Sequence, residues 1–206
     1  KTLTINSATT QFGSSTVLTG TGSINLTGTQ NLDLPTSFSL TSSSALLFGG
    51  TVTVSGAGTF NIQTGALLTL TADTINTNLD IQTGGQLTVA EGSSSLTAVV
   101  TTVSGDLLVQ STSAGGATLT VSNGFSNNGT ITLDSNYVIG GRTTTFNLAS
   151  GQTLVNSDTG TIEFTNSGNR SNSVINFNAE LDNQGTIDVD HDTTITTSGT
   201  LTSTHG

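Results

Sequence analysis

The stretch Asn-Gly-Thr-Ile-Thr-Leu at residues 128–133 decides the fold of this chain. It joins an amide residue and a glycine to a short run in which polar and aliphatic residues alternate. Related stretches occur at residues 21–26, 57–62, 159–164 and 184–189. Alternation with a period of two indicates a half-buried β-strand, and glycine and asparagine suit the preceding corner because both tolerate a positive φ. The chain therefore repeats one corner and one strand.

The spacing of these stretches indicates how the strands are arranged. Strands of the form Leu-x-Leu or Leu-x-Val begin at Leu68, Leu87 and Leu107, about 19 and 20 residues apart, and the later glycine-threonine-isoleucine stretches are about 31 and 25 residues apart. A period of roughly 20–30 residues with two or three short strands is typical of one coil of a β-solenoid. An antiparallel sandwich is the alternative, but only Asn123-Gly124 and Asn128-Gly129 offer weak hairpin turns.

The composition excludes several classes of protein. The 206 residues include three Lys or Arg and 13 Asp or Glu, for a net charge of −10. We therefore expect no nucleic-acid partner, because three cations cannot neutralise a run of phosphates. No apolar stretch approaches the ~18 residues of a membrane-spanning helix, so we expect no membrane insertion. The absence of cysteine excludes zinc–thiolate sites, disulfides and cysteine nucleophiles.

The same composition predicts one all-β domain. Helix-forming residues are scarce, threonine favours pleated surfaces, and no charge block or proline-rich tract separates two parts of the chain. We expect a single parallel β-solenoid over residues 1–206, with about eight or nine coils, which either stands alone or is a segment of a longer repeat array. Stacked inward-facing Ile, Leu, Val and Phe would form its core.

Two further sets of side chains are expected to stack between coils. Phenylalanines that alternate with polar neighbours should point inward, and they are Phe60, Phe164 and Phe177. Asparagines near the corners could form ladders of stacked amides. These are Asn127, Asn128, Asn156, Asn166 and Asn183.

Residues 119–133 and 182–189 resemble the strand repeats of filamentous-haemagglutinin-type adhesins and autotransporter passenger domains. The resemblance covers most of the chain, and is best from about residue 50 to residue 190. It implies a right-handed parallel β-helix outside the cell, on a bacterial surface. It further implies a non-enzymatic adhesin, stalk or fibre segment whose partner is a component of a host or neighbouring cell surface, or another copy of the chain.

The candidate metal site lies near the end of the chain. Asp188, Asp190 and Asp192 stand at alternate positions, so on a strand they would share one face, and coil stacking would place Glu163 one coil away from Asp188. Carboxylate oxygens in such a row suit Ca²⁺. The alternative is a solvated acidic surface that keeps the rod soluble. No other cofactor is expected.

The main functional alternative is a polysaccharide-acting β-helix lyase or hydrolase. Such enzymes combine acidic groups with basic ones, and this chain offers few: Arg142, Arg170 and His191, with His205 near the end. Arg142 follows Gly140-Gly141 and is expected to mark a protruding loop. We expect no enzymatic activity from this segment.

Two other possibilities concern the surface and the ends. Rows of threonine, as at residues 51–54, 67–71 and 143–145, place hydroxyls at strand spacing, and flat threonine arrays can match an ice lattice. Residues 1–5 and 193–197 are expected to be strands without helical caps. Open strand edges favour pairing with another chain, so a self-assembling filament is a further hypothesis.

Overall fold

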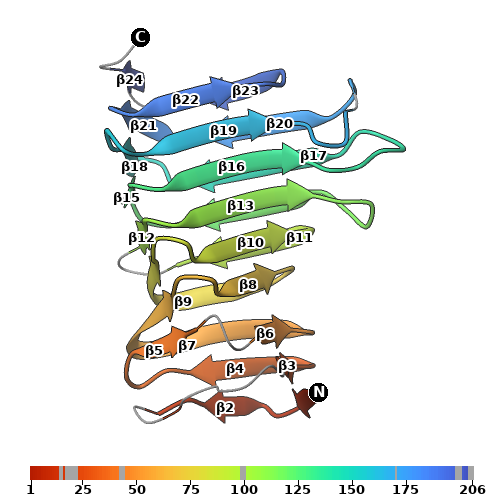
Figure 1. The fold of residues 1–206 in the computed structure, drawn as a ribbon, viewed down its shortest axis with the longest axis vertical. Coiled ribbons are helices and arrows are strands. Elements are labelled where there is room, and N and C mark those ends of the chain that lie inside the picture. Colours follow the sequence, from red (N-terminus) through yellow and green to blue (C-terminus); the bar gives the residue numbers. More distant parts are fainter. Residues whose placement is uncertain are drawn as a thin grey trace.

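The chain is a β-solenoid of about eight turns, built from parallel strands (Figure 1). This confirms the predicted all-β parallel architecture. The structure is a computed structural model that describes residues 1–13, 16, 23–41, 45–97, 101–169, 171–197 and 201–203. Within these residues there are 24 strands and no helix, so none is available to span a membrane.

Face 1 is a nine-stranded parallel sheet to which each coil contributes one strand. The stretch at residues 128–133 contributes one strand to this sheet, and the related stretches at residues 159–164 and 184–189 contribute two others, whereas residues 57–62 belong to the other sheet. In spatial order the strands are β1 (Thr2–Ile5), β3 (Ser23–Leu26), β6 (Ala45–Phe48), β8 (Leu67–Leu70), β10 (Gln86–Ala90), β13 (Asp106–Ser111), β16 (Thr130–Ser135), β19 (Thr161–Thr165) and β22 (Thr186–Val189).

The other two faces merge into one sheet, because β7 (Thr51–Ile62) and β9 (Thr74–Ile81) each run around the corner between them. Their first halves belong to face 2 and their second halves to face 3. Face 2 also contains β2 (Thr9–Gln11), β4 (Thr29–Asp33), β11 (Gly92–Leu96), β14 (Ala117–Val121), β17 (Thr143–Leu148), β20 (Val174–Asn178) and β23 (Thr193–Thr196). Face 3 also contains β5 (Phe38–Leu40), β12 (Thr101–Val103), β15 (Phe125–Asn127), β18 (Thr153–Asn156), β21 (Glu180–Asn183) and β24 (Leu201–Ser203).

Inward side chains of face 1 form an apolar column, one residue per coil. Its inner members have no solvent-accessible surface, and they are Leu46, Leu68, Leu87, Leu107, Ile131 and Ile162. Each of these side chains is covered by the coils above and below it. A single coil has too few aliphatic residues to form a core, but the stacked coils bury them together. At the ends of the rod the cover is lost, and Leu3 and Val189 are each more than half exposed.

The phenylalanine prediction is confirmed. Phe60, Phe164 and Phe177 are buried, and Phe177 contacts two neighbouring rings. Its ring centroid lies 5.2 Å from that of Phe146 in a stacked arrangement and 5.6 Å from that of Phe164 in an edge-on one. Aromatic pairs in these geometries stabilise the interior beyond the area they bury, by ~0.5–1.5 kcal/mol each.

Three of the five predicted corner asparagines form a buried ladder between faces 3 and 1. Asn127 Nδ2 donates to Asn156 Oδ1 at 2.8 Å, and Asn156 Nδ2 donates to Asn183 Oδ1 at 2.7 Å. Each amide nitrogen of the pair also donates to a backbone carbonyl of the next coil, at Thr161 or Thr186. Asn128 lies on the exposed side of the same corner, and Asn166 lies at a different corner, after β19.

Coils of very different length stack in register because their extra residues lie in loops outside the sheets. Thr2 and Ser23 are neighbours 21 residues apart, whereas Thr132 and Glu163 are neighbours 31 residues apart. The extra residues of the later coils lie between β13 and β14, β16 and β17, and β19 and β20. All three insertions are at the corner between face 1 and face 2, so they form one cluster.

Candidate functional site: a loop lobe at one corner

The most prominent departure from the regular rod is this cluster of loops. It comprises residues 112–116, 136–142 and 166–173, hereafter the loop lobe; Arg170 lies outside the described residues. In Figure 1 the loops extend sideways beyond the ends of the strands. Loops held by a rigid scaffold are common positions for binding residues, which makes the lobe the first candidate for a functional site.

The loops of the lobe stack tightly on one another. A Cβ atom added at Gly168 would lie 2.6 Å from the backbone nitrogen of Tyr137, and one added at Gly141 would collide with the carbonyl oxygen of Asn172. Only glycine allows such approach between backbones. The lobe is therefore a packed continuation of the coils.

Arg142 ties the loops together at the base of the lobe. Its guanidinium carbon lies 4.9 Å from the centre of the Tyr137 ring, a cation–π contact worth roughly 0.5–1 kcal/mol at such a site. Its Nη2 donates to the carbonyl oxygen of Ser113 at 3.2 Å. The prediction that Gly140-Gly141-Arg142 marks a protruding loop is confirmed, and the structure adds a role for the arginine in holding that loop.

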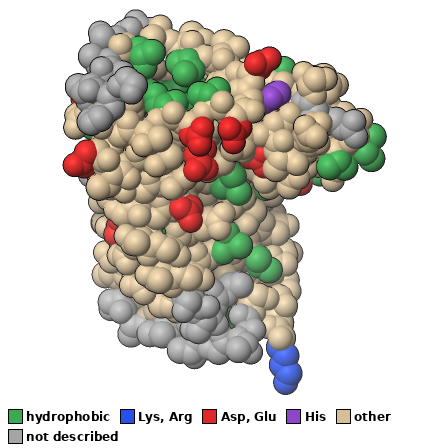
Figure 2. All heavy atoms as spheres, turned by 45° about the horizontal axis from the view of Figure 1, so that its top comes forward, with side chains coloured by type: hydrophobic (Ala, Val, Ile, Leu, Met, Phe, Trp, Pro, Cys, Tyr) green, Lys and Arg blue, Asp and Glu red, His purple; other side chains and the backbone are tan. Residues whose placement is uncertain are grey.

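The tip of the lobe exposes two aliphatic side chains, Val138 at 55% and Ile139 at 80%. Figure 2 shows hydrophobic side chains at the end of the lobe that projects from the rod. This exposed pair was not predicted from the sequence. A signal was present: Val138 and Ile139 are adjacent rather than alternating with polar residues, and two glycines follow them.

A buried carboxylate anchors the lobe from below. Asp134, at the end of β16, is only 4% exposed. It accepts hydrogen bonds from Gln110 Nε2 at 2.8 Å, from Thr165 Oγ1 at 3.0 Å, and from the backbone nitrogen and Oγ of Ser167 at 2.8 and 2.6 Å. Four donors to one carboxylate satisfy a group whose burial would otherwise be costly. They fix the start of the third loop.

A row of buried hydroxyls continues the anchor across three coils. Ser111 Oγ donates to Ser135 Oγ at 3.2 Å, and Ser135 Oγ donates to Ser173 Oγ at 2.9 Å. Thr144 Oγ1 donates to the carbonyl oxygen of Asp134 at 2.7 Å. The corner under the lobe is thus polar and hydrogen-bonded, which gives it a defined geometry.

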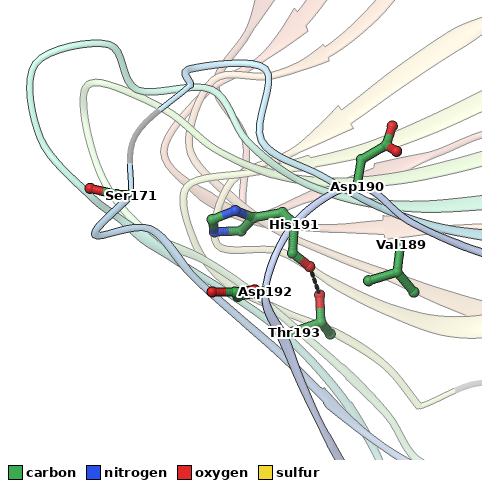
Figure 3. Close-up of a pocket in the computed structure, with 6 residues that line it drawn as sticks. All are labelled: Ser171, Val189, Asp190, His191, Asp192 and Thr193. Atoms are coloured by element: carbon green, nitrogen blue, oxygen red, sulfur yellow. Dashed lines mark hydrogen bonds between the residues drawn. The ribbon is translucent and has the colours of Figure 1, made fainter.

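An open hollow of about 570 Å³ lies where the last coil meets the lobe (Figure 3). His191 Nε2 lies 3.1 Å from the carbonyl oxygen of Ser173, and Thr193 Oγ1 donates to the carbonyl oxygen of His191 at 2.9 Å. The residues that line the hollow are Ser171, Val189, Asp190, His191, Asp192 and Thr193. These described residues include two carboxylates and one imidazole, and Arg170, which precedes Ser171, lies outside the described residues.

The three predicted calcium ligands follow one another without gathering around one point. Asp188 pairs with Glu163 across β22 and β19, as the stacking argument expected. β22 ends at Val189, so Asp190 and Asp192 lie beyond the strand, and Figure 3 shows their carboxylates pointing in different directions. Among the described residues, no three His, Asp or Glu side chains form a group that could hold a metal ion. The calcium prediction therefore rests on the sequence alone.

Comparisons with protein-family models, curated proteins and solved structures found no match to this chain. The likeness to bacterial adhesin repeats therefore remains an expectation from the sequence. Any functional argument has to come from the rod, its lobe and its surfaces.

Proposed function

We propose that this chain is a non-enzymatic structural and adhesive β-solenoid, a stiff segment of an extracellular stalk or fibre. The observation that carries the proposal is the unbroken parallel pairing of face 1 from β1 to β22. In-register pairing and an apolar column connect successive coils, and an amide ladder adds a further link across three of them, so the segment resists bending. A rod of this kind holds a binding surface away from the structure that carries it.

The loop lobe is the part of the rod that suits adhesion. It is rigid at its base, through Arg142 and Asp134, and apolar at its tip, through Val138 and Ile139. Exposed aliphatic groups on a fixed support lose little conformational entropy when they bind. The partner would be a component of a host or neighbouring cell surface. The net charge of −10 would repel anionic envelopes and limit non-specific contact.

An adhesion assay tests the lobe. The chain is displayed on non-adherent cells, and binding to candidate cell surfaces is counted for the wild type and for a Val138→Ser/Ile139→Ser variant. We expect the variant to lose most of the binding. Leu47→Ser, which removes an exposed leucine from face 1, serves as the control and should bind normally. Equal binding by all three proteins would contradict an adhesive lobe.

A filament subunit is the second candidate, favoured by the last coil. Val189, Ile195 and Leu201 all belong to this coil and are between about a third and just over a half exposed, because no coil covers them here. Figure 2 shows hydrophobic side chains gathered at this end. Electron microscopy of the purified chain would show long filaments if ends pair, and short single rods if they do not.

The enzyme alternative makes a separate prediction. The hollow with His191, Asp190 and Asp192 would have to process a polysaccharide. A turnover assay on uronate polymers, with His191→Ala as the comparison, discriminates between the two classes. We expect no turnover by either protein, and turnover that depends on His191 would overturn the non-enzymatic proposal.

A further inference from the structure

Face 2 carries two columns of small polar side chains on its outer surface, of which the central one is unbroken. The central column has one residue from each of nine successive coils, aligned by parallel pairing: Thr9, Asn31, Thr53, Thr74, Ser95, Thr120, Asn147, Asn178 and Thr196. A second column beside it contains Ser93, Thr118, Thr145, Asn176 and Thr194, preceded by the pair Thr29 and Thr51. These are the hydroxyl–amide columns. They contain only threonine, serine and asparagine.

The columns are regular although the coils are not. Thr74 and Ser95 are neighbours 21 residues apart, while Asn147 and Asn178 are neighbours 31 residues apart. Most of the additional residues lie in the loop lobe and the others lie at another corner, so they do not interrupt the face. Adjacent residues of a column therefore keep the spacing of paired strands, about 4.8 Å. The variable sequence period therefore leaves the spacing of the columns unchanged.

The columns are also free of charge on a strongly acidic molecule. Of the 13 acidic residues, only Asp33 lies within a face 2 strand, at the end of β4 and outside both columns. By contrast, face 1 carries outward Asp106, Glu163 and Asp188, and face 3 carries Asp80 and Asp182. A surface from which all charge is excluded complements an uncharged partner, because charged groups would have to be desolvated on contact.

The side chains of the columns are held in place. Thr74 Oγ1 and Ser95 Oγ lie 2.9 Å apart, and Asn178 Nδ2 donates to Asn147 Oδ1 at 2.8 Å. Threonine is stiff at χ1 because it is β-branched. The hydroxyls and amides thus form an array whose positions are set before any partner binds, which lowers the entropic cost of binding.

We propose that face 2 binds ice, through the match between the hydroxyl–amide columns and an ordered lattice of water molecules. Such a partner is uncharged, periodic and rich in both donors and acceptors, as are the columns. A sugar platform would expose aromatic rings for stacking, and a protein interface would have an apolar core. Neither column contains an aromatic or aliphatic side chain.

Thermal hysteresis of the purified chain, together with its incorporation into a growing ice front, tests this proposal. The informative variant is Thr120→Tyr, which puts a large ring in the middle of the central column while keeping high strand propensity. Thr69→Tyr is the matched control, because Thr69 is a half-buried outward threonine on β8 of face 1. Thermal unfolding of all three proteins verifies that the coils remain intact.

We expect the wild type and Thr69→Tyr to depress the freezing point and enter the ice front, and Thr120→Tyr to lose most of both activities. No hysteresis and no incorporation by the folded wild type would overturn the proposal. Equal losses in the two variants would exclude face 2 as the binding surface. Sedimentation with an insoluble neutral polysaccharide that depends on Thr120, without any effect on ice, would show that the occupant is a glycan and that the ice proposal is wrong.

Discussion

The apolar column beneath face 1 and the asparagine ladder at the corner between faces 3 and 1 connect the same coils in different ways. The column accepts leucine or isoleucine at successive levels, because desolvation has no preferred direction. The ladder needs an amide at its central level, since Asn156 accepts from Asn127 and donates to Asn183. Burial therefore holds the stack together, while the ladder fixes which residue lies above which.

Leu107→Ala in the middle of the apolar column is the change with the largest expected effect. It leaves a cavity between Leu87 and Ile131, both without accessible surface. We expect a loss of about 3 kcal/mol in the free energy of unfolding. Chemical denaturation measures it, with Leu108→Ala, on the outward side of the same strand, as the control. A loss of similar size in both variants would mean that the column has no special role.

Asn156→Ala breaks the ladder at its central level. It removes the acceptor for Asn127 Nδ2 and the donor to Asn183 Oδ1, and leaves the carbonyl oxygen of Thr186 without this amide. Buried groups without partners cost roughly 1–3 kcal/mol each, so we expect destabilisation of about 2 kcal/mol. Asn128→Ala, at the exposed side of the corner, should change the free energy of unfolding by under about 0.5 kcal/mol.

The Asn156→Ala variant also tests whether the ladder, and not burial, sets the register of the coils. If the ladder sets the register, Asn156→Ala should accelerate amide hydrogen exchange in β18 and β21 while β13 and β16 keep their protection. Uniform acceleration over all four strands would show that the two devices form one cooperative unit.

The sequence was sufficient to predict features that repeat from coil to coil. The strands of face 1, the inward phenylalanines and the Asn127, Asn156 and Asn183 ladder each consist of similar residues that recur in several coils. Buried single residues were not predicted. Asp134 follows an alternating strand and resembles any outward carboxylate, but its donors include Thr165 and Ser167, 31 and 33 residues away. A local sequence pattern cannot predict contacts between residues that are more than 30 positions apart.

The polar columns of face 2 were predicted only in part. Threonine rows were visible in the sequence, but the coil lengths varied, so their alignment could not be derived. The alignment depends on the corner at which the inserted residues lie. Glycines 141 and 168 mark that corner only once the loops that they contact are known.

Asp73→Asn tests a buried polar group immediately before β9, beneath face 2. Asp73 is buried, and its carboxylate accepts hydrogen bonds from the backbone nitrogens of Val52 at 2.7 Å and Thr71 at 2.9 Å. Desolvation by burial raises the pKa of Asp73, although these hydrogen bonds oppose the rise. A raised pKa in the folded state means that protonation favours folding. This contribution is present in full below the unfolded pKa of about 3.8 and is lost as the pH rises through the folded value.

We therefore expect the stability advantage of the wild type over Asp73→Asn to shrink as the pH is raised from about 4 through the folded pKa of Asp73. Urea denaturation at several pH values measures the difference. Asn128→Ala, which changes no titratable group, is the control and should remain parallel to the wild type over the same range. An advantage that grows with pH would contradict burial as the cause of the shift.

Arg142→Ala has the smallest expected effect, because it acts on the lobe and leaves both the column and the ladder intact. The variant loses the contact over the Tyr137 ring and the hydrogen bond to the carbonyl oxygen of Ser113. Since the contacts are peripheral, we expect a loss of under about 1 kcal/mol in the free energy of unfolding. The local effect should be larger: amide exchange in residues 136–142 should accelerate while β16 and β17 remain protected. Arg142→Lys is the control, since it keeps the charge but replaces the planar guanidinium. If even Arg142→Ala leaves the exchange of the loop unchanged, the backbone packing at Gly141 and Gly168 is sufficient to hold the lobe.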